Sequence, residues 1–67
     1  MKIESRLTEW MDLKELSIYK LSKRSKLSKE TISRARDNRI ESCTLKSLGK
    51  IAKSLGLKIS DLYSEKD

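Results

Sequence analysis

Apolar residues recur at spacings of three and four along most of this chain, which is the pattern of amphipathic helices. Four segments show this periodicity: residues 3–13, 18–24, 29–37 and 45–55. A last short turn, capped by Ser60, is expected before a polar tail over residues 64–67. The pattern therefore predicts an all-α fold, a compact bundle of five short helices in a single domain spanning residues 1–63.

Because the chain has no proline and only two glycines, the helix boundaries are predicted from polar capping residues. Ser17, Ser28 and Thr44 each precede a periodic segment, where a side-chain oxygen can accept a hydrogen bond from a backbone amide of the first turn. Asn38 is expected to end the third helix in the left-handed conformation, and Gly56 to stop the fourth.

Each helix is expected to turn one apolar stripe toward a common core. With Leu13 as a further candidate, the expected core residues are Ile3, Leu7, Trp10, Met11, Leu16, Leu21, Leu27, Ile32, Ala35, Leu45, Leu48, Ile51, Ala52, Leu55, Leu57 and Leu62. Their regular recurrence between charged residues favours a folded module over a disordered chain.

The composition offers little chemistry to an enzyme. The 67 residues include no histidine and one cysteine, Cys43, so the usual base for activating a nucleophile is missing, as are the residues for a disulfide or a zinc site. No apolar run is long enough to cross a bilayer, and the N-terminus lacks the apolar stretch of a signal peptide. We expect a cytoplasmic, non-enzymatic protein without cofactor, metal, membrane contact or small-molecule ligand.

The positive charge is concentrated in the middle of the chain. Residues 17–39 contain eight basic and two acidic residues, and so carry +6, which equals the net charge of the whole protein. Residues 1–16 contribute −1 and residues 40–67 contribute +1. A concentrated surplus of this kind is typical of a protein that binds a polyanion, although a solvated helix face is the alternative.

The basic segment also has the layout of a helix-turn-helix unit. Two helices of about two turns are joined by a short turn, residues 25–27, and in such units the second helix lies in the major groove of DNA. Leu21 and Ile32 are expected to point inward and to fix the angle between the helices. The opposite side of the second helix of the pair then carries Lys29, Glu30, Ser33 and Arg34.

Three stretches, residues 17–22, 27–34 and 45–62, resemble the Cro and phage-repressor type of helix-turn-helix domain, the XRE family. Residues 31–34 and 48–56 carry the most specific part of the likeness. The resemblance implies a lambda-repressor-like DNA-binding fold of five helices, which usually acts as a homodimer on a palindromic operator.

The chain departs from the family pattern at several positions. Lys26 stands where the turn usually has glycine, so it must accept a left-handed backbone or the turn must adjust. Arg36 stands where an acidic residue is common and Met11 where its basic partner often lies, so that ion pair is absent. The loop after Asn38 lacks the usual proline and is one residue longer.

Position and chemistry suggest which side chains meet DNA. The candidates for base contact are Lys29, Glu30, Ser33 and Arg34. The candidates for phosphate contact are Ser17, the backbone amide of Ile18, Lys26, Thr31, Arg39 and Thr44. For Glu30 a purely structural role is as plausible, since an acid in the first turn is stabilised by the helix dipole and can pair with Arg34. Thr31 either contacts phosphate or packs against the preceding helix.

Four apolar residues outside the core stripes suggest a dimer interface: Ile40, Cys43, Ile59 and Tyr63. A two-fold dimer would place two recognition helices one DNA turn apart, about 34 Å. The alternative for Ile40 and Tyr63 is that they cap the small core.

The sequence therefore favours a sequence-specific transcriptional regulator of double-stranded DNA, most simply a repressor that occupies its operator with the helix over residues 29–37. The alternative is a protein-interaction module, antitoxin-like or an anti-regulator, for which DNA contact is secondary.

Overall fold

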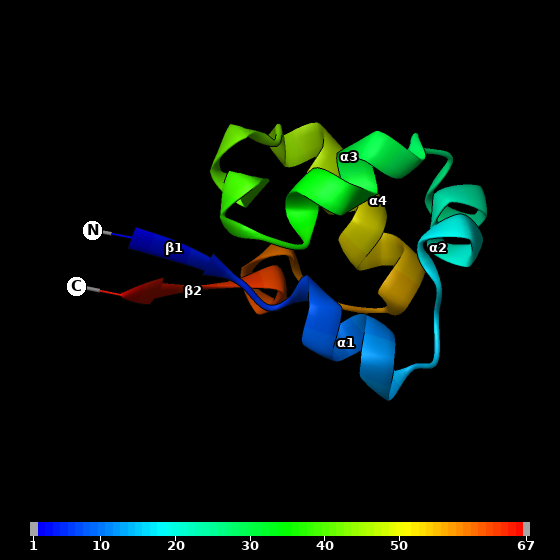
Figure 1. Cartoon of the computed structure of the whole chain (residues 1–67), viewed down its shortest axis with the longest axis horizontal. Coiled ribbons are helices and arrows are strands. Elements are labelled where there is room, and N and C mark those ends of the chain that lie inside the picture. Colours follow the sequence, from blue (N-terminus) through cyan, green and yellow to red (C-terminus); the bar gives the residue numbers. More distant parts are fainter. Residues whose placement is uncertain (1, 67) are drawn as a thin grey trace.

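The structure is a computed structural model, and it describes residues 2–66 of the chain. Within this range the elements are, in chain order, β1 (Lys2–Ser5), α1 (Leu7–Leu13), α2 (Ile18–Ser25), α3 (Lys29–Ala35), the 3-10 helix η1 (Asn38–Ser42), α4 (Leu45–Leu55), the 3-10 helix η2 (Ile59–Leu62) and β2 (Tyr63–Lys66). Figure 1 shows the helices gathered together, with the small sheet projecting to one side. None of the helices in residues 2–66 is long and apolar enough to span a membrane. The mostly helical fold is confirmed, whereas the predicted five helices without strands are wrong.

Three helices begin where their predicted capping residues place them. The side-chain oxygens of Ser17, Ser28 and Thr44 each accept a hydrogen bond from the backbone amide three residues later, at 3.1 to 3.2 Å. Gly56 ends α4 with φ 71°, the left-handed conformation that glycine adopts without a steric penalty. The starts of α2, α3 and α4 are thus fixed locally.

One apolar core joins the helices. Its fully buried large side chains are Leu7, Met11, Leu21, Ile32, Ile51 and Leu62. They come from α1, α2, α3, α4 and η2, so every helix except η1 supplies at least one of them. Ile40 of η1 is 3% exposed and completes the core from that side.

Two leucines expected in the core are exposed instead, Leu13 at 73% and Leu45 at 72%. Leu13 lies two residues after the buried Met11, which turns it about 200° around the helix and onto the opposite face. Leu45 is the first residue of α4, and because helical side chains lean toward the N-terminus, it projects past the edge of the core.

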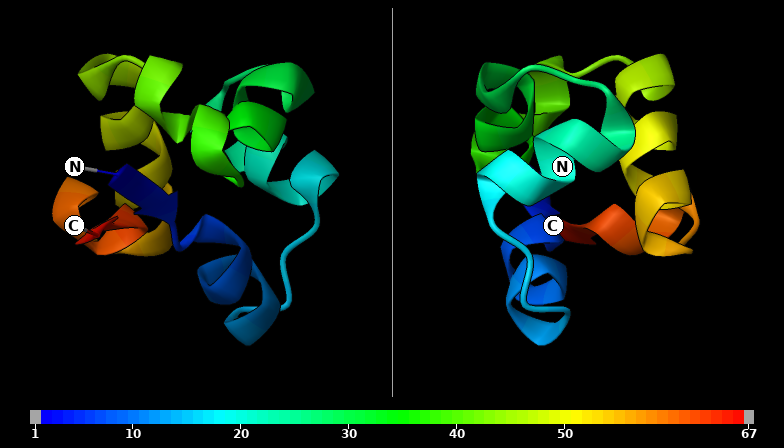
Figure 2. Two further views of the ribbon diagram at one scale, coloured as in Figure 1. Left: turned by 60° about the vertical axis from the view of Figure 1, so that its left-hand side comes forward. Right: turned by 90° about the vertical axis from the view of Figure 1, so that its right-hand side faces the viewer.

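The two ends of the chain pair as an antiparallel sheet, which overturns the predicted helical start at Ile3 and the polar tail over 64–67. In β1 and β2, Ile3 lies opposite Glu65 and Ser5 opposite Tyr63. The extended conformation ends at Arg6, whose backbone amide donates to the Leu62 carbonyl at 2.8 Å. Helix α1 therefore begins at Leu7, and Figure 2 shows the sheet beside η2, drawn in orange. Residue 67 of the predicted tail lies outside the described residues.

The segment after α3 is also more regular than the predicted polar loop. Helix α3 ends at Ala35, and Asn38 is the first residue of η1 with no left-handed backbone, so its predicted role is wrong. The reason is Asp37, whose side chain accepts a hydrogen bond from the backbone amide of Arg39 at 2.8 Å and starts a new helical turn.

The last turn is held by Asp61, and the prediction that Ser60 caps it is wrong. Asp61 Oδ2 accepts a hydrogen bond from the Lys58 backbone amide at 2.9 Å. Ser60 lies inside η2 and does not cap it. Trp10 donates from its indole Nε1 to the Asp61 carbonyl at 2.7 Å. This bond ties α1 to η2 and satisfies the only polar group of the tryptophan.

Candidate nucleic-acid interface

The turn between α2 and α3 is set by Lys26, which adopts the left-handed conformation with φ 60° and ψ 33°. Two serine hydroxyls of α2 stabilise the end of this helix and the turn that follows it. Ser22 donates to the Leu27 carbonyl at 2.5 Å, and the buried Ser25 donates to the Leu21 carbonyl at 2.7 Å. With Leu21 and Ile32 fully buried behind the turn, the two helices are held as one unit.

Replacing Lys26 by glycine is expected to raise the free energy of unfolding by about 0.5 to 1 kcal/mol, because glycine has no Cβ to strain in a left-handed turn. Urea denaturation followed by circular dichroism measures this. The reverse substitution serves as the control. Gly56→Ala introduces a Cβ at φ 71° and is expected to lower the free energy of unfolding by about 1 kcal/mol. A loss of stability in Lys26→Gly would show that the turn is not strained.

The four predicted base-contact residues lie on the side of α3 that faces away from the core. Lys29 and Glu30 are exposed, and Ser33 and Arg34 are half-buried. On the opposite side of the same seven-residue helix, Ile32 and Ala35 have no exposed surface. The helix therefore presents a polar face on a firmly anchored backbone, which is the arrangement that a major-groove reader requires.

Glu30 and Arg34 pair on this face, with 3.2 Å between Glu30 Oε1 and Arg34 Nη2. Their side chains remain 77% and 39% exposed, so the ion pair stabilises the helix by only about 0.3 to 0.5 kcal/mol. The predicted ion pair between Glu30 and Arg34 therefore forms in the protein without DNA. Because the pair is weak, it does not prevent Arg34 from exchanging Glu30 for a base or a phosphate.

The predicted phosphate-contact residues occupy helix starts and connecting segments. Ser17 and Thr44 are exposed at the starts of α2 and α4, and Lys26 is exposed in the turn. Thr31, which is half-buried, lies 2.9 Å from the Ser28 hydroxyl through its own Oγ1. The amide of Ile18 precedes the first internal hydrogen bond of α2, which Leu21 donates to Ser17 at 3.0 Å.

Arg39 is already occupied by an acid. Its Nε lies 3.1 and 3.2 Å from the two carboxylate oxygens of Asp37, and its Nη2 lies 2.9 Å from Oδ2. These hydrogen bonds, foremost the side-chain bond to Arg39, lower the pKa of Asp37 below its ordinary 3.8. The pair therefore supports the fold above about pH 3.8 and is lost as the pH falls through the folded-state pKa. Any phosphate bound by Arg39 must compete with Asp37.

A contact that the sequence did not reveal joins α1 to the end of α3. Thr8 Oγ1 accepts a hydrogen bond from Arg36 Nε at 3.2 Å and donates one to the Arg36 carbonyl at 3.3 Å. A neutral hydroxyl of α1 thus holds the residue that follows α3.

Tyr19 is the second feature that the sequence analysis missed. It is 52% exposed on the first turn of α2, and the Nζ atoms of Lys23 and Lys29 lie 4.7 and 5.0 Å from its ring centroid. Its four-residue spacing from Lys23 was a signal for the first contact. The second crosses to another helix, and no local spacing reveals it.

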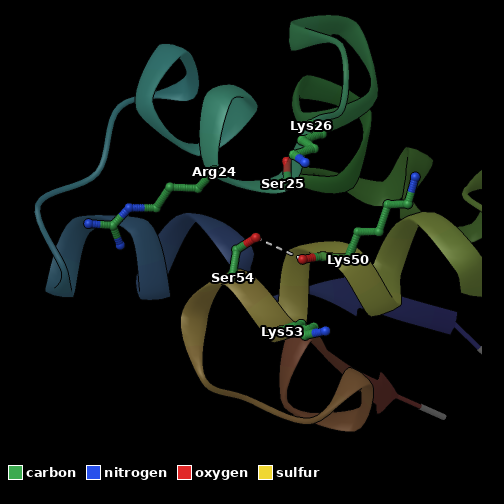
Figure 3. A pocket seen from close by; sticks show the side chains of 6 residues that line it. All are labelled: Arg24, Ser25, Lys26, Lys50, Lys53 and Ser54. Atoms are coloured by element: carbon green, nitrogen blue, oxygen red, sulfur yellow. Dashed lines mark hydrogen bonds between the residues drawn. The ribbon is translucent and has the colours of Figure 1, made fainter.

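A pocket lined by basic residues lies between the end of α2 and α4 (Figure 3). The six residues that line this pocket include four cations and no acid: Arg24, Ser25, Lys26, Lys50, Lys53 and Ser54. Each serine hydroxyl donates to the carbonyl four residues earlier in its own helix, Ser54 to Lys50 at 2.8 Å and Ser25 to Leu21. In Figure 3 Arg24 extends away from the two α4 lysines, so the side chains do not converge on one point.

The four residues predicted at a dimer interface differ in how much surface they offer. Ile40 is 3% exposed and belongs to the core, so it has almost nothing to present to a second copy. Cys43, Ile59 and Tyr63 are half-buried against the core. Burial raises the pKa of the Cys43 thiol, which suits a small apolar filler better than a reactive cysteine.

A short helix pair with a fixed turn, buried on one side and polar on the other, defines this structure as a helix-turn-helix domain. The chain belongs to the family of Cro/C1-type HTH DNA-binding domains, whose family model matches residues 6–66. The predicted membership is thereby confirmed, and with it the prediction of a DNA-binding regulator. Neither the curated proteins nor the solved structures contain a match to the chain.

Proposed function

We propose that this protein is a repressor that recognises one double-stranded DNA sequence by inserting α3 into the major groove. The polar outer face of α3, opposite the fully buried Ile32 and Ala35, is the observation that carries the proposal. Arg34 would make a bidentate contact to guanine, and Lys29 would donate to guanine O6 or N7. Ser33 lies between them, and Glu30 can accept from the amino group of cytosine.

Phosphate contacts would flank this reading face. Ser17, the Ile18 amide and Lys26 precede α3 in the chain, and Arg39 and Thr44 follow it. Thr31 supplies a hydroxyl from α3 itself. In the proposed complex these groups fix the position of the protein on the duplex, and the α3 side chains read the sequence.

The operator is proposed to be palindromic and to bind a homodimer. Cys43, Ile59 and Tyr63, each half-buried beside the core, would contribute to the contact between the two copies. Two-fold symmetry would then place the two α3 helices one turn of DNA apart, about 34 Å.

Lys26→Ala is expected to reduce the salt dependence of DNA binding, because each neutralised phosphate contributes about one unit to the slope of log K against log salt. We expect the slope to flatten by about one unit, as measured by fluorescence anisotropy with a labelled duplex. The matched control is Lys58→Ala, which removes an exposed lysine beside η2 and is expected to leave the slope unchanged. Equal slopes for the wild type and both variants would contradict a phosphate contact at Lys26.

The same titration separates the alternative function. A protein-interaction module for which DNA is secondary would bind every duplex weakly and show no preferred sequence. A preferred duplex bound with a steep salt dependence supports the repressor.

A further inference from the structure

Tyr19 brings cations from two helices to one aromatic ring. Lys23 lies one turn further along α2, with its Nζ 4.7 Å from the ring centroid. Lys29 is the first residue of α3, with its Nζ 5.0 Å from the same centroid. Both distances are within the range of about 6 Å over which an aromatic face attracts a cation.

The geometry follows from the two capped helix starts. The Ser17 cap fixes the first turn of α2, which carries Tyr19, and the Ser28 cap fixes the first turn of α3, which carries Lys29. Because helical side chains lean toward the N-terminus of their helix, the Lys29 side chain extends from the start of α3 toward α2. The ring and the ammonium group are therefore held together by elements that are themselves rigid.

Tyr19 is not part of the core, and this makes its position informative. Half of its surface is exposed, whereas the next apolar residue of α2, Leu21, is fully buried. Its ring is thus available to side chains on the outside of the helix pair. One of the two side chains that it contacts, Lys29, is a proposed base reader.

We propose that Tyr19 is a positioning residue that holds the Lys29 ammonium group at the start of the reading face of α3. This inference rests on the proposed function. Lysine carries its charge on a flexible four-carbon chain, and ordering that chain opposes binding. A ring that orders the lysine before DNA arrives removes part of this cost. Discrimination at the base pair read by Lys29 therefore depends on Tyr19.

The contact itself is tested by NMR of the protein without DNA. The ring current of Tyr19 is expected to shift the ε-methylene protons of Lys29 away from their ordinary position. Tyr19→Phe keeps the ring and is expected to keep the shift, whereas Tyr19→Leu is expected to abolish it. Unshifted Lys29 protons in the wild type would overturn the proposal.

The effect on recognition is tested with the preferred duplex and its single-base-pair variants. Lys29→Ala identifies the base pair that Lys29 reads, as the position where discrimination is lost. At that base pair Tyr19→Leu is expected to reduce discrimination about two- to fivefold, the range of an exposed cation–π contact, while Tyr19→Phe retains it. In a Lys29→Ala background, Tyr19→Leu is expected to have no further effect. Lys23→Met, which removes only the other cation, is expected to leave discrimination unchanged.

The outcomes separate the two proposals. If the wild type selects a duplex but Tyr19→Leu discriminates as well as the wild type, positioning by Tyr19 is refuted and the proposed function stands. If Lys29→Ala loses discrimination at no base pair, Lys29 reads none and the inference fails. If the wild type selects no duplex at all, the proposed function fails and the inference fails with it.

Discussion

Replacing Ile32 by alanine is expected to destabilise the domain by about 3 kcal/mol, within the range of 2 to 5 kcal/mol for such truncations of buried aliphatic side chains. Ile32 has no exposed surface and holds α3 to the rest of the core, so its loss leaves a cavity beneath the reading face. A domain of this size has only about 5 kcal/mol of stability in total. About 2 kcal/mol would then remain, so roughly one molecule in thirty would be unfolded at 25 °C, as measured by urea denaturation followed by circular dichroism.

Leu45→Ala is the matched control, because it also truncates an aliphatic side chain within the first four residues of a helix. Leu45 is 72% exposed, so we expect a change below about 0.5 kcal/mol. Equal losses for Ile32→Ala and Leu45→Ala would mean that the described core is not the one that holds the fold.

Replacing Arg34 by alanine is expected to weaken binding to the preferred duplex by about 1 to 3 kcal/mol, the value of one bidentate contact to guanine. Binding to an unrelated duplex should change much less, because no base contact is lost there. The variant should remain folded, since the exposed pair with Glu30 contributes less than 1 kcal/mol. Fluorescence anisotropy with both duplexes measures the two affinities.

Lys53→Ala is a suitable control for this comparison, because it removes an exposed positive charge from α4 and leaves α3 intact. We expect it to change the two affinities by the same small factor. If Arg34→Ala also weakens both duplexes equally, Arg34 contacts phosphate and does not read a base.

The helices and most of the core could be predicted from the sequence because their signals are local. Ser17, Ser28 and Thr44 each cap a helix through an amide only three residues away. The sheet could not be predicted in this way, because β1 pairs with residues about 60 positions later. The four-residue spacing of Ile3 and Leu7 also mimics a helix although Ile3 lies in a strand.

The candidate site was predictable in part for the same reason. The residues on the polar face of α3 follow from helical periodicity alone, and the Glu30 and Arg34 pair follows from their spacing. The contact of Lys29 with Tyr19 and the hydrogen bonds of Arg36 with Thr8 join different helices. Such contacts depend on the packing of the whole domain, which no local pattern contains.

Selection of duplexes from a random pool by the wild-type protein tests the central claim most directly. We expect enrichment of one sequence composed of two half-sites related by two-fold symmetry, with centres one helical turn apart, about 34 Å. A pool that stays random after repeated selection, with the protein shown to be folded by circular dichroism, would contradict sequence-specific recognition by α3.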